Sequence, residues 1–274
     1  MIAIIEKSYF CRQKLIKHFD MKQIFIMLSL CVLLFGCTKD WGIPTTRNYP
    51  INAPYSGLDV SNAFQVTVSD QITDVVVTVG DLAHENVDVK VINGTLHIGF
   101  KPMTFNNYNG VATAVIPASV LRDLELSGAS SFTGDLSGDD VDIDLSGASI
   151  YRGNVITNDL DLDLSGASTY IGTIDVDKLD ADLSGASTVT VGGYGQSLMK
   201  INLSGGSQLN AANFEVPVVN GSMSGGSFAD VNCCTSLNVS LSGGSTLIYG
   251  TLFEDCHPVV NCPTSGGSMV KPRG

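Results

Sequence analysis

The tetrapeptide Ser-Gly-Ala-Ser, or its variant Ser-Gly-Gly-Ser, occurs eight times between residues 127 and 268 of this 274-residue chain. Successive copies recur at nearly constant intervals of about 20 residues, and a period of this length indicates a solenoid. In such a fold each repeat forms one coil. The copies begin at Ser127, Ser146, Ser165, Ser184, Ser204, Ser224, Ser242 and Ser265.

The residues before each copy alternate between apolar and polar, as in residues 160–164, which read Leu-Asp-Leu-Asp-Leu. A period of two is typical of a β-strand with one buried face, and a second short strand follows each copy. We therefore predict an all-β fold, a single-stranded parallel β-helix (β-solenoid) with about 19–20 residues per coil. The rule for parallel crossovers favours a right-handed helix. The aromatic column Phe132, Tyr151 and Tyr170 is expected to stack in the interior, and the alternative is an exposed platform on which sugars stack.

Residues 51–126 also alternate in polarity, but they lack the tetrapeptide. Solenoids need atypical terminal units, so we expect these residues to form irregular first coils. The regular repeats occupy residues 127–274, and no Pro/Ser-rich linker separates the two parts. Residues 51–274 are therefore predicted to form one solenoid domain.

Acidic residues recur two and four positions before the first four copies of the tetrapeptide. Parallel stacking would place these like charges one strand spacing apart, which is destabilising. Three interpretations remain open: a solvated face that blocks lateral sheet addition, a weak Ca²⁺-binding ladder, or a catalytic site. The eight residues are Asp123, Glu125, Asp142, Asp144, Asp161, Asp163, Asp180 and Asp182.

Four cysteines lie in the last coils, where stacking could bring two of them within disulfide range. Cys233 and Cys256 both lie nine residues before a tetrapeptide, so we predict that they are bonded. The alternative is a Cys234–Cys256 bond, because the last coil contains an insertion. Cys256 and Cys262 match no standard zinc motif, and no metal site is predicted with them.

The N-terminal segment has the features of a targeting signal. Residues 24–35 form an apolar run too short to span a bilayer but typical of a signal peptide. The run ends at Gly36-Cys37, so residues 21–36 look like a bacterial lipoprotein signal, with Cys37 as the lipidated residue. We interpret residues 1–20 as an upstream extension wrongly assigned to the chain, and residues 37–50 as a lipid-anchored tether.

Three features resemble the family described as putative auto-transporter adhesin, head GIN domain. They are the turn of residues 93–98, Asn-Gly-Thr-Leu-His-Ile, the strand of residues 111–116, and the segment 124–130, Leu-Glu-Leu-Ser-Gly-Ala-Ser, with its later copies. The resemblance covers roughly residues 55–250. It implies a β-helical secreted or surface-anchored protein, often a lipoprotein of Gram-negative bacteria, without established catalytic residues.

These observations favour a non-enzymatic cell-envelope lipoprotein that presents a rigid β-helix for adhesion or ligand binding. We expect it to be anchored in the outer membrane through Cys37, facing the periplasm or the exterior, and to bind a glycan, a matrix component or another envelope protein. The formal net charge of -12 argues against nucleic acid as a partner. No cofactor is predicted apart from weakly bound Ca²⁺. The alternative is a carbohydrate-active β-helix enzyme acting on polysaccharide.

Overall fold

The computed structural model describes residues 41–101 and 108–273. The predicted upstream extension, signal peptide and lipidated Cys37 lie outside these residues. Residues from Trp41 onward form a compact unit, and strands dominate its secondary structure. The part of the chain that the structure describes contains no candidate transmembrane helix.

The first nine strands and one short helix precede or accompany the first tetrapeptide. They are β1 (Pro44–Tyr49), β2 (Gly57–Val60), β3 (Phe64–Ser69), β4 (Val75–Gly80), the 3-10 helix η1 (Asp81–Asn86), β5 (Val87–Ile92), β6 (Thr95–Phe100), β7 (Ala112–Pro117), β8 (Asp123–Leu126) and β9 (Ser131–Thr133). The remaining strands build the repeats. They are β10 (Leu136–Ser137), β11 (Asp140–Leu145), β12 (Ile150–Arg152), β13 (Val155–Ile156), β14 (Asp159–Leu164), β15 (Thr169–Leu183), β16 (Thr188–Leu203), β17 (Gln208–Met223), β18 (Phe228–Leu241), β19 (Thr246–Gly250), β20 (Val259–Val260) and β21 (Met269–Pro272).

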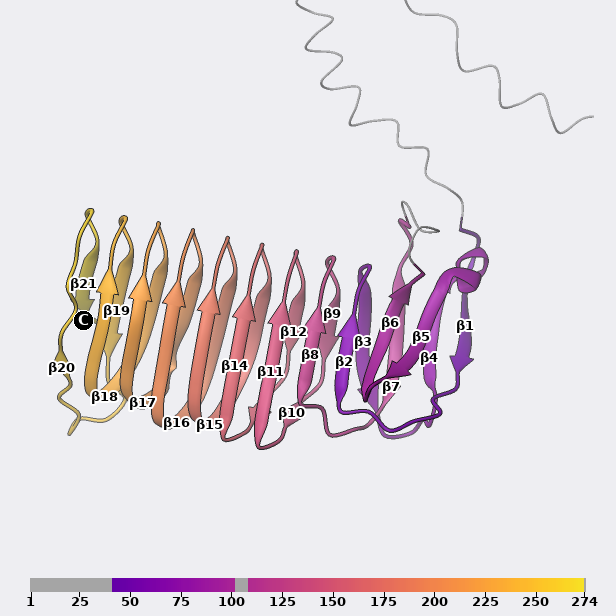
Figure 1. Ribbon diagram of the computed structural model, residues 1–274, viewed down its shortest axis with the longest axis horizontal. Coiled ribbons are helices and arrows are strands. Elements are labelled where there is room, and N and C mark those ends of the chain that lie inside the picture. Colours follow the sequence, from indigo (N-terminus) through magenta and orange to yellow (C-terminus); the bar gives the residue numbers. More distant parts are fainter. Residues whose placement is uncertain (1–40, 102–107, 274) are drawn as a thin grey trace, which may run out of the picture. The chain divides into compact units, whose positions relative to one another are not determined.

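Each repeat makes one coil, and equivalent strands of successive coils pair in parallel (Figure 1). Asp142 pairs with Asp123 of the coil before and with Asp161 of the coil after, so residues one period apart lie side by side. The next coils continue through Asp180 and Lys200. The predicted β-solenoid, in which one sequence repeat forms one coil, is therefore confirmed.

The interior is filled by the columns that the alternation predicts. Residues one position before each tetrapeptide, from Leu126 to Leu241, are buried. The aromatic column also lies inside: the rings of Phe132 and Tyr151 stack with centroids 5.8 Å apart, and those of Tyr151 and Tyr170 with centroids 4.8 Å apart. Stacked aromatic rings of this kind add to the stability gained from burial alone.

The first coils are irregular, as predicted, because their order in space differs from their order in the chain. The coil formed by β2 and β3 lies between the later strands β6 and β7 on one side and β8 and β9 on the other. Beyond β6 and β7, the antiparallel strands β5, β4 and β1 close this end of the stack (Figure 1). We call β1, β4, η1 and β5 the N-terminal cap.

The predicted tether of residues 37–50 is wrong for its described part. Strand β1 pairs with β4 over its whole length. The hydroxyl of Tyr49 lies 3.0 Å from Nδ1 of the buried His84, and Trp41 is buried in the core. These contacts make residues 41–50 part of the domain, so the solenoid begins earlier than residue 51.

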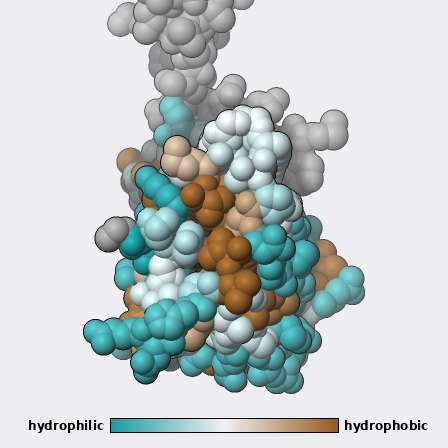
Figure 2. All heavy atoms as spheres, turned by 90° about the vertical axis from the view of Figure 1, so that its left-hand side faces the viewer, coloured by the Kyte–Doolittle hydropathy of each residue, from teal (hydrophilic) through white to brown (hydrophobic). Residues whose placement is uncertain are grey.

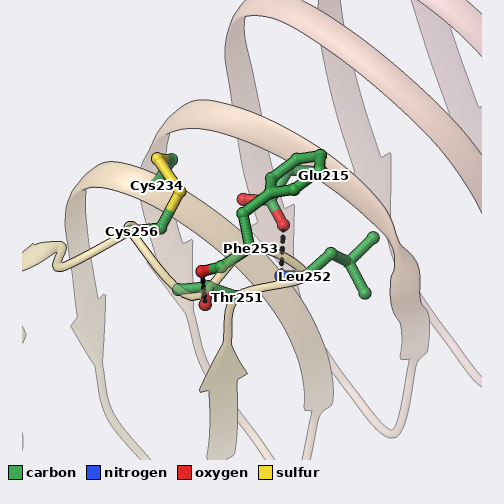
Figure 3. The surroundings of a disulfide bond; sticks show 6 residues. All are labelled: Glu215, Cys234, Thr251, Leu252, Phe253 and Cys256. Carbon is green, nitrogen blue, oxygen red and sulfur yellow. Dashed lines mark hydrogen bonds between the residues drawn. A yellow bond between two sulfur atoms is a disulfide. The ribbon is translucent and has the colours of Figure 1, made fainter.

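The predicted Cys233–Cys256 bond is also wrong: the disulfide joins Cys234 to Cys256, with Cα atoms 4.6 Å apart (Figure 3). Cys233 pairs with Val216 and its side chain is buried in the core. Cys256 lies in an insertion, residues 251–258. Before this segment, Phe228 of β18 pairs with Thr246, but after it Ser236 pairs with Val259, so the sequence interval between paired residues is larger. The insertion removes Cys256 from the strand register that the prediction assumed. A hydrogen bond also holds the same insertion, since Oε2 of the buried Glu215 accepts a hydrogen bond of 2.7 Å from the Leu252 amide.

Candidate functional site

The eight predicted carboxylates lie in two columns on one strand stack. We call Glu125, Asp144, Asp163 and Asp182 the groove column, and Asp123, Asp142, Asp161 and Asp180 the far column. Each residue pairs with its equivalent in the next coil, for example Asp144 with Asp163. Both columns therefore form as the repeat predicts, with a vertical spacing of about 4.8 Å.

An open groove with a volume of about 740 Å³ runs along the stack beside the groove column. Its other wall is formed by the first serines of the tetrapeptides, which follow each strand at the corner of the coil. The far column does not line this groove. The lining residues include Glu125, Asp144, Asp163, Asp182, Asn202, Ser222, Ser146, Ser165, Ser184, Ser204 and Ser224.

The local structure of the corner explains why the serines are positioned so regularly. In the repeat that begins at Ser184, the last serine, Ser187, is buried and its Oγ donates a hydrogen bond of 2.8 Å to the Ser184 carbonyl. The Ser184 Oγ donates to the Leu164 carbonyl of the preceding coil, at 3.5 Å. The Ser146 Oγ makes the equivalent bond to the Leu126 carbonyl, at 3.4 Å. Because these hydroxyl protons are directed to backbone carbonyls, Ser146 and Ser184 offer mainly lone pairs to the groove.

Stacked carboxylates raise one another's pKa. The pKa of Asp163 is raised above its ordinary value, first by partial burial and then by Asp144 and Asp182. Burial and the flanking carboxylates also raise the pKa values of Asp142 and Asp161 in the far column. These shifts have the direction expected of like charges held together.

Polar and basic side chains end both columns toward the C-terminus. The Lys200 ammonium lies 2.6 Å from Oδ2 of Asp180 and ends the far column. In the groove column, Nδ2 of Asn202 donates a hydrogen bond of 2.6 Å to Oδ1 of Asp182. The most strongly acidic part of the groove therefore spans the coils before Asn202.

The structure adds two residues that the repeat analysis missed. Asp59 of β2 pairs with Glu125, so it extends the groove column by one coil, and His97 of β6 pairs with Asp59. His97 Nδ1 lies 2.7 Å from Oδ2 of Asp59. The pKa of Glu125 is raised by burial, then by Asp59 and Asp144, while His97 opposes the increase. One signal was available: residues 58–60, Leu-Asp-Val, have the same alternation as residues 124–126, Leu-Glu-Leu.

No cluster of three or more His, Cys, Asp or Glu side chains is placed to hold a metal ion in residues 41–101 and 108–273. The carboxylates of each column follow one another along a line rather than converge on a point. Weak Ca²⁺ binding therefore stays a prediction for solution measurement.

The chain belongs to the family described as putative auto-transporter adhesin, head GIN domain, whose model matches residues 54–251. Solved structures share the fold. A putative lipid binding protein from Parabacteroides distasonis has 20% sequence identity and a TM-score of 0.74, covering 85% of this chain and 98% of its own. A putative adhesin from Parabacteroides merdae has 18% identity and a TM-score of 0.72, covering 85% and 97%. Another putative adhesin from P. distasonis has 22% identity and a TM-score of 0.70, covering 85% and 98%. No curated protein matches the chain.

Proposed function

We propose that this protein is a non-enzymatic lipoprotein of the cell envelope that binds an extended glycan along the groove. The observation that carries the proposal is the chemical character of the groove walls. Carboxylates accept hydrogen bonds but donate none when ionised, and the hydroxyl protons of Ser146 and Ser184 are directed to backbone carbonyls of the preceding coil. A ligand for such a surface must supply many donors at regular intervals.

A glycan chain meets this requirement because its hydroxyl groups recur along its length. The carboxylates repeat about every 4.8 Å along the stack, so several can receive hydroxyl protons from one bound chain. Phosphate-rich and sulfate-rich polymers would be repelled by the groove column. We therefore expect a neutral or amino-sugar glycan rather than an acidic one. A matrix component or an envelope protein rich in basic side chains is the competing ligand.

The two acidic columns provide a matched test. Residues 38–274, which contain the whole compact unit, would be applied to a glycan array. The double substitution Asp144→Asn and Asp163→Asn changes the groove wall, whereas Asp142→Asn and Asp161→Asn removes the same charge from the far column. We expect the first pair to reduce glycan binding about tenfold or more, since each charged hydrogen bond contributes about 1.5–3 kcal/mol, and the second pair to change it little.

Equal losses for the two pairs would show that net charge, and not the groove, governs binding. Absence of binding to every neutral and amino-sugar glycan would contradict the proposed ligand class. Incubation with neutral and acidic polysaccharides, followed by measurement of new chain ends, separates the binding function from the enzyme alternative. We expect no new ends, and product formation would favour the enzyme.

The proposed anchor is tested separately in the full-length chain. Cys37→Ala should move the protein from the membrane fraction to the soluble fraction and remove the mass of the acyl chains. More than one acyl chain is required for stable attachment. A variant that remains in the membrane fraction would contradict anchoring through Cys37. Glycan binding by residues 38–274 does not depend on this result.

A further inference from the structure

The two ends of the solenoid are finished differently. At one end, the N-terminal cap covers the first coils with antiparallel strands. At the other end, the last layer consists of the insertion of residues 251–258 and the short strands β20 and β21, which stack on β18 and β19. Among the residues that the structure describes, no further strand pairs with the outer edge of β20 or β21. The outer backbone edges of these two strands are therefore open.

The apolar interior columns continue into this open end. Leu237 is completely buried, but Val260, the residue stacked on it, is 39% exposed. Val270 likewise continues the column of the buried Leu247 and is partly exposed. Val259 and Met269 add exposed apolar surface, at 71% and 52%. Figure 2, which views this end, shows a band of hydrophobic atoms flanked by hydrophilic ones.

The charge of the open end differs from that of the rest of the chain. Residues 242–273 contain two acidic residues, Glu254 and Asp255, and two basic ones, Lys271 and Arg273, so their formal net charge is zero. The whole chain carries -12, and the acidic columns end before these coils. Two copies of the chain would repel each other side by side, but they can meet at these neutral ends.

The backbone of β21 also favours a dimer over a larger assembly. The amides of Met269 and Arg273 donate toward β19, so alternation directs the amides of Val270 and Pro272 outward. Proline has no N–H group, which leaves Val270 as the outward donor of the strand. A two-fold axis beside Val270 would let two copies exchange one pair of hydrogen bonds. The shortage of donors disfavours a longer added strand.

We infer that the open C-terminal end binds the same end of a second copy of this chain. The two solenoids are related by a two-fold axis and bury Val259, Val260, Met269 and Val270 between them. One coil supplies enough chain for such a contact, because the segment 251–273 matches the roughly 20–30 residues that a standard interface uses on each side. Two-fold symmetry is the commonest arrangement for identical subunits.

Sedimentation velocity of residues 38–274 over a range from micromolar to near-millimolar concentration tests the inference. We expect a monomer–dimer equilibrium. Val259→Lys places a charge in the contact and should weaken the dimer about tenfold or more, because an unpaired charge is costly to bury. Val120→Lys is the matched control, since Val120 is 64% exposed but precedes β8, and it should change the dimer affinity less than about twofold.

Far-UV circular dichroism confirms that each variant keeps its strand content, and Met269→Lys provides a second test of the same surface. A protein that stays monomeric at all concentrations would overturn the inference. So would a dimer that tolerates both Val259→Lys and Met269→Lys. Oligomers that keep growing with concentration would also overturn it, because they indicate head-to-tail contacts.

Discussion

The corner of the coil makes a sharp prediction about two adjacent glycines. Gly205 and Gly206 are the second and third residues of one tetrapeptide. Gly205 has φ +69°, and a Cβ atom there would lie 2.6 Å from the Gly185 carbonyl oxygen of the preceding coil. At Gly206 a Cβ would lie 3.8 Å from the same oxygen, which is an ordinary contact. The Gly206 amide donates a hydrogen bond of 2.7 Å to that oxygen.

Gly205→Ala should therefore destabilise the protein, whereas Gly206→Ala should not. The left-handed backbone costs a non-glycine residue about 1–2 kcal/mol. Moving the corner to relieve the collision weakens the Gly206 hydrogen bond, whose net contribution is about 1 kcal/mol. The expected total is about 2–3 kcal/mol, and at about 2–4 °C per kcal/mol for a domain of this size the unfolding midpoint should fall by roughly 8 °C. Gly206→Ala should leave the midpoint unchanged or raise it slightly, because alanine reduces the entropy of the unfolded chain.

Thermal unfolding followed by far-UV circular dichroism compares the two variants with the parent. The chain itself contains the control, because repeats such as residues 165–168 already have alanine in the third position. If Gly205→Ala lowered the midpoint no more than Gly206→Ala, the close approach of successive corners would not be what requires glycine there.

Three further predictions concern charge, redox state and metal. The raised carboxyl pKa values mean that the folded chain takes up protons at a higher pH than the unfolded chain, so stability should rise as pH falls from 7 toward the ordinary carboxyl pKa of about 4. In urea unfolding, Asp163→Asn should raise the midpoint at pH 7 and have less effect at pH 4; a parent that loses stability between pH 7 and 5 would contradict this reasoning. Reduction of the Cys234–Cys256 bond, whose partners have a sequence separation of 22, should lower stability by about 3 kcal/mol in the chain-entropy model, while peptide mapping without reduction should find Cys233 and Cys262 free. Calorimetric titration with millimolar Ca²⁺ should give weak heat that disappears in a variant with Asp144→Asn and Asp163→Asn, and no heat in the parent would remove the cation prediction.

The regular coils were predictable because their information is local and repeated. Each tetrapeptide marks a corner, and the residue four positions earlier, such as Asp142, must stack on its equivalent one period away. The same logic placed the aromatic column inside. In a solenoid, residues separated by one sequence period are neighbours in space. The eight carboxylates of the two columns could therefore be found by counting positions from each tetrapeptide.

The prediction of neighbouring residues failed where the sequence interval between stacked strands no longer equals one coil. Asp59 and His97 join the groove column because β2 is stacked between strands that come later in the chain, and no periodicity signals that order. The cysteine pairing failed because the insertion at residues 251–258 breaks the register of Cys256 with the strand that contains Cys233. Both errors come from long-range contacts outside the repeat.

The position of the coil formed by β2 and β3 has a consequence for how the protein is made. One side of this coil is covered by β8 and β9, which end at Thr133. Because the chain is made from its N-terminus, the coil of β2 and β3 cannot gain this covering layer until about half of the sequence has been synthesised. During that time the backbone groups along one side of residues 57–69 lack hydrogen-bond partners, and this segment is the one that chaperones would have to protect. Every later coil is added to a coil that is already folded, so folding beyond this point can proceed as the chain elongates.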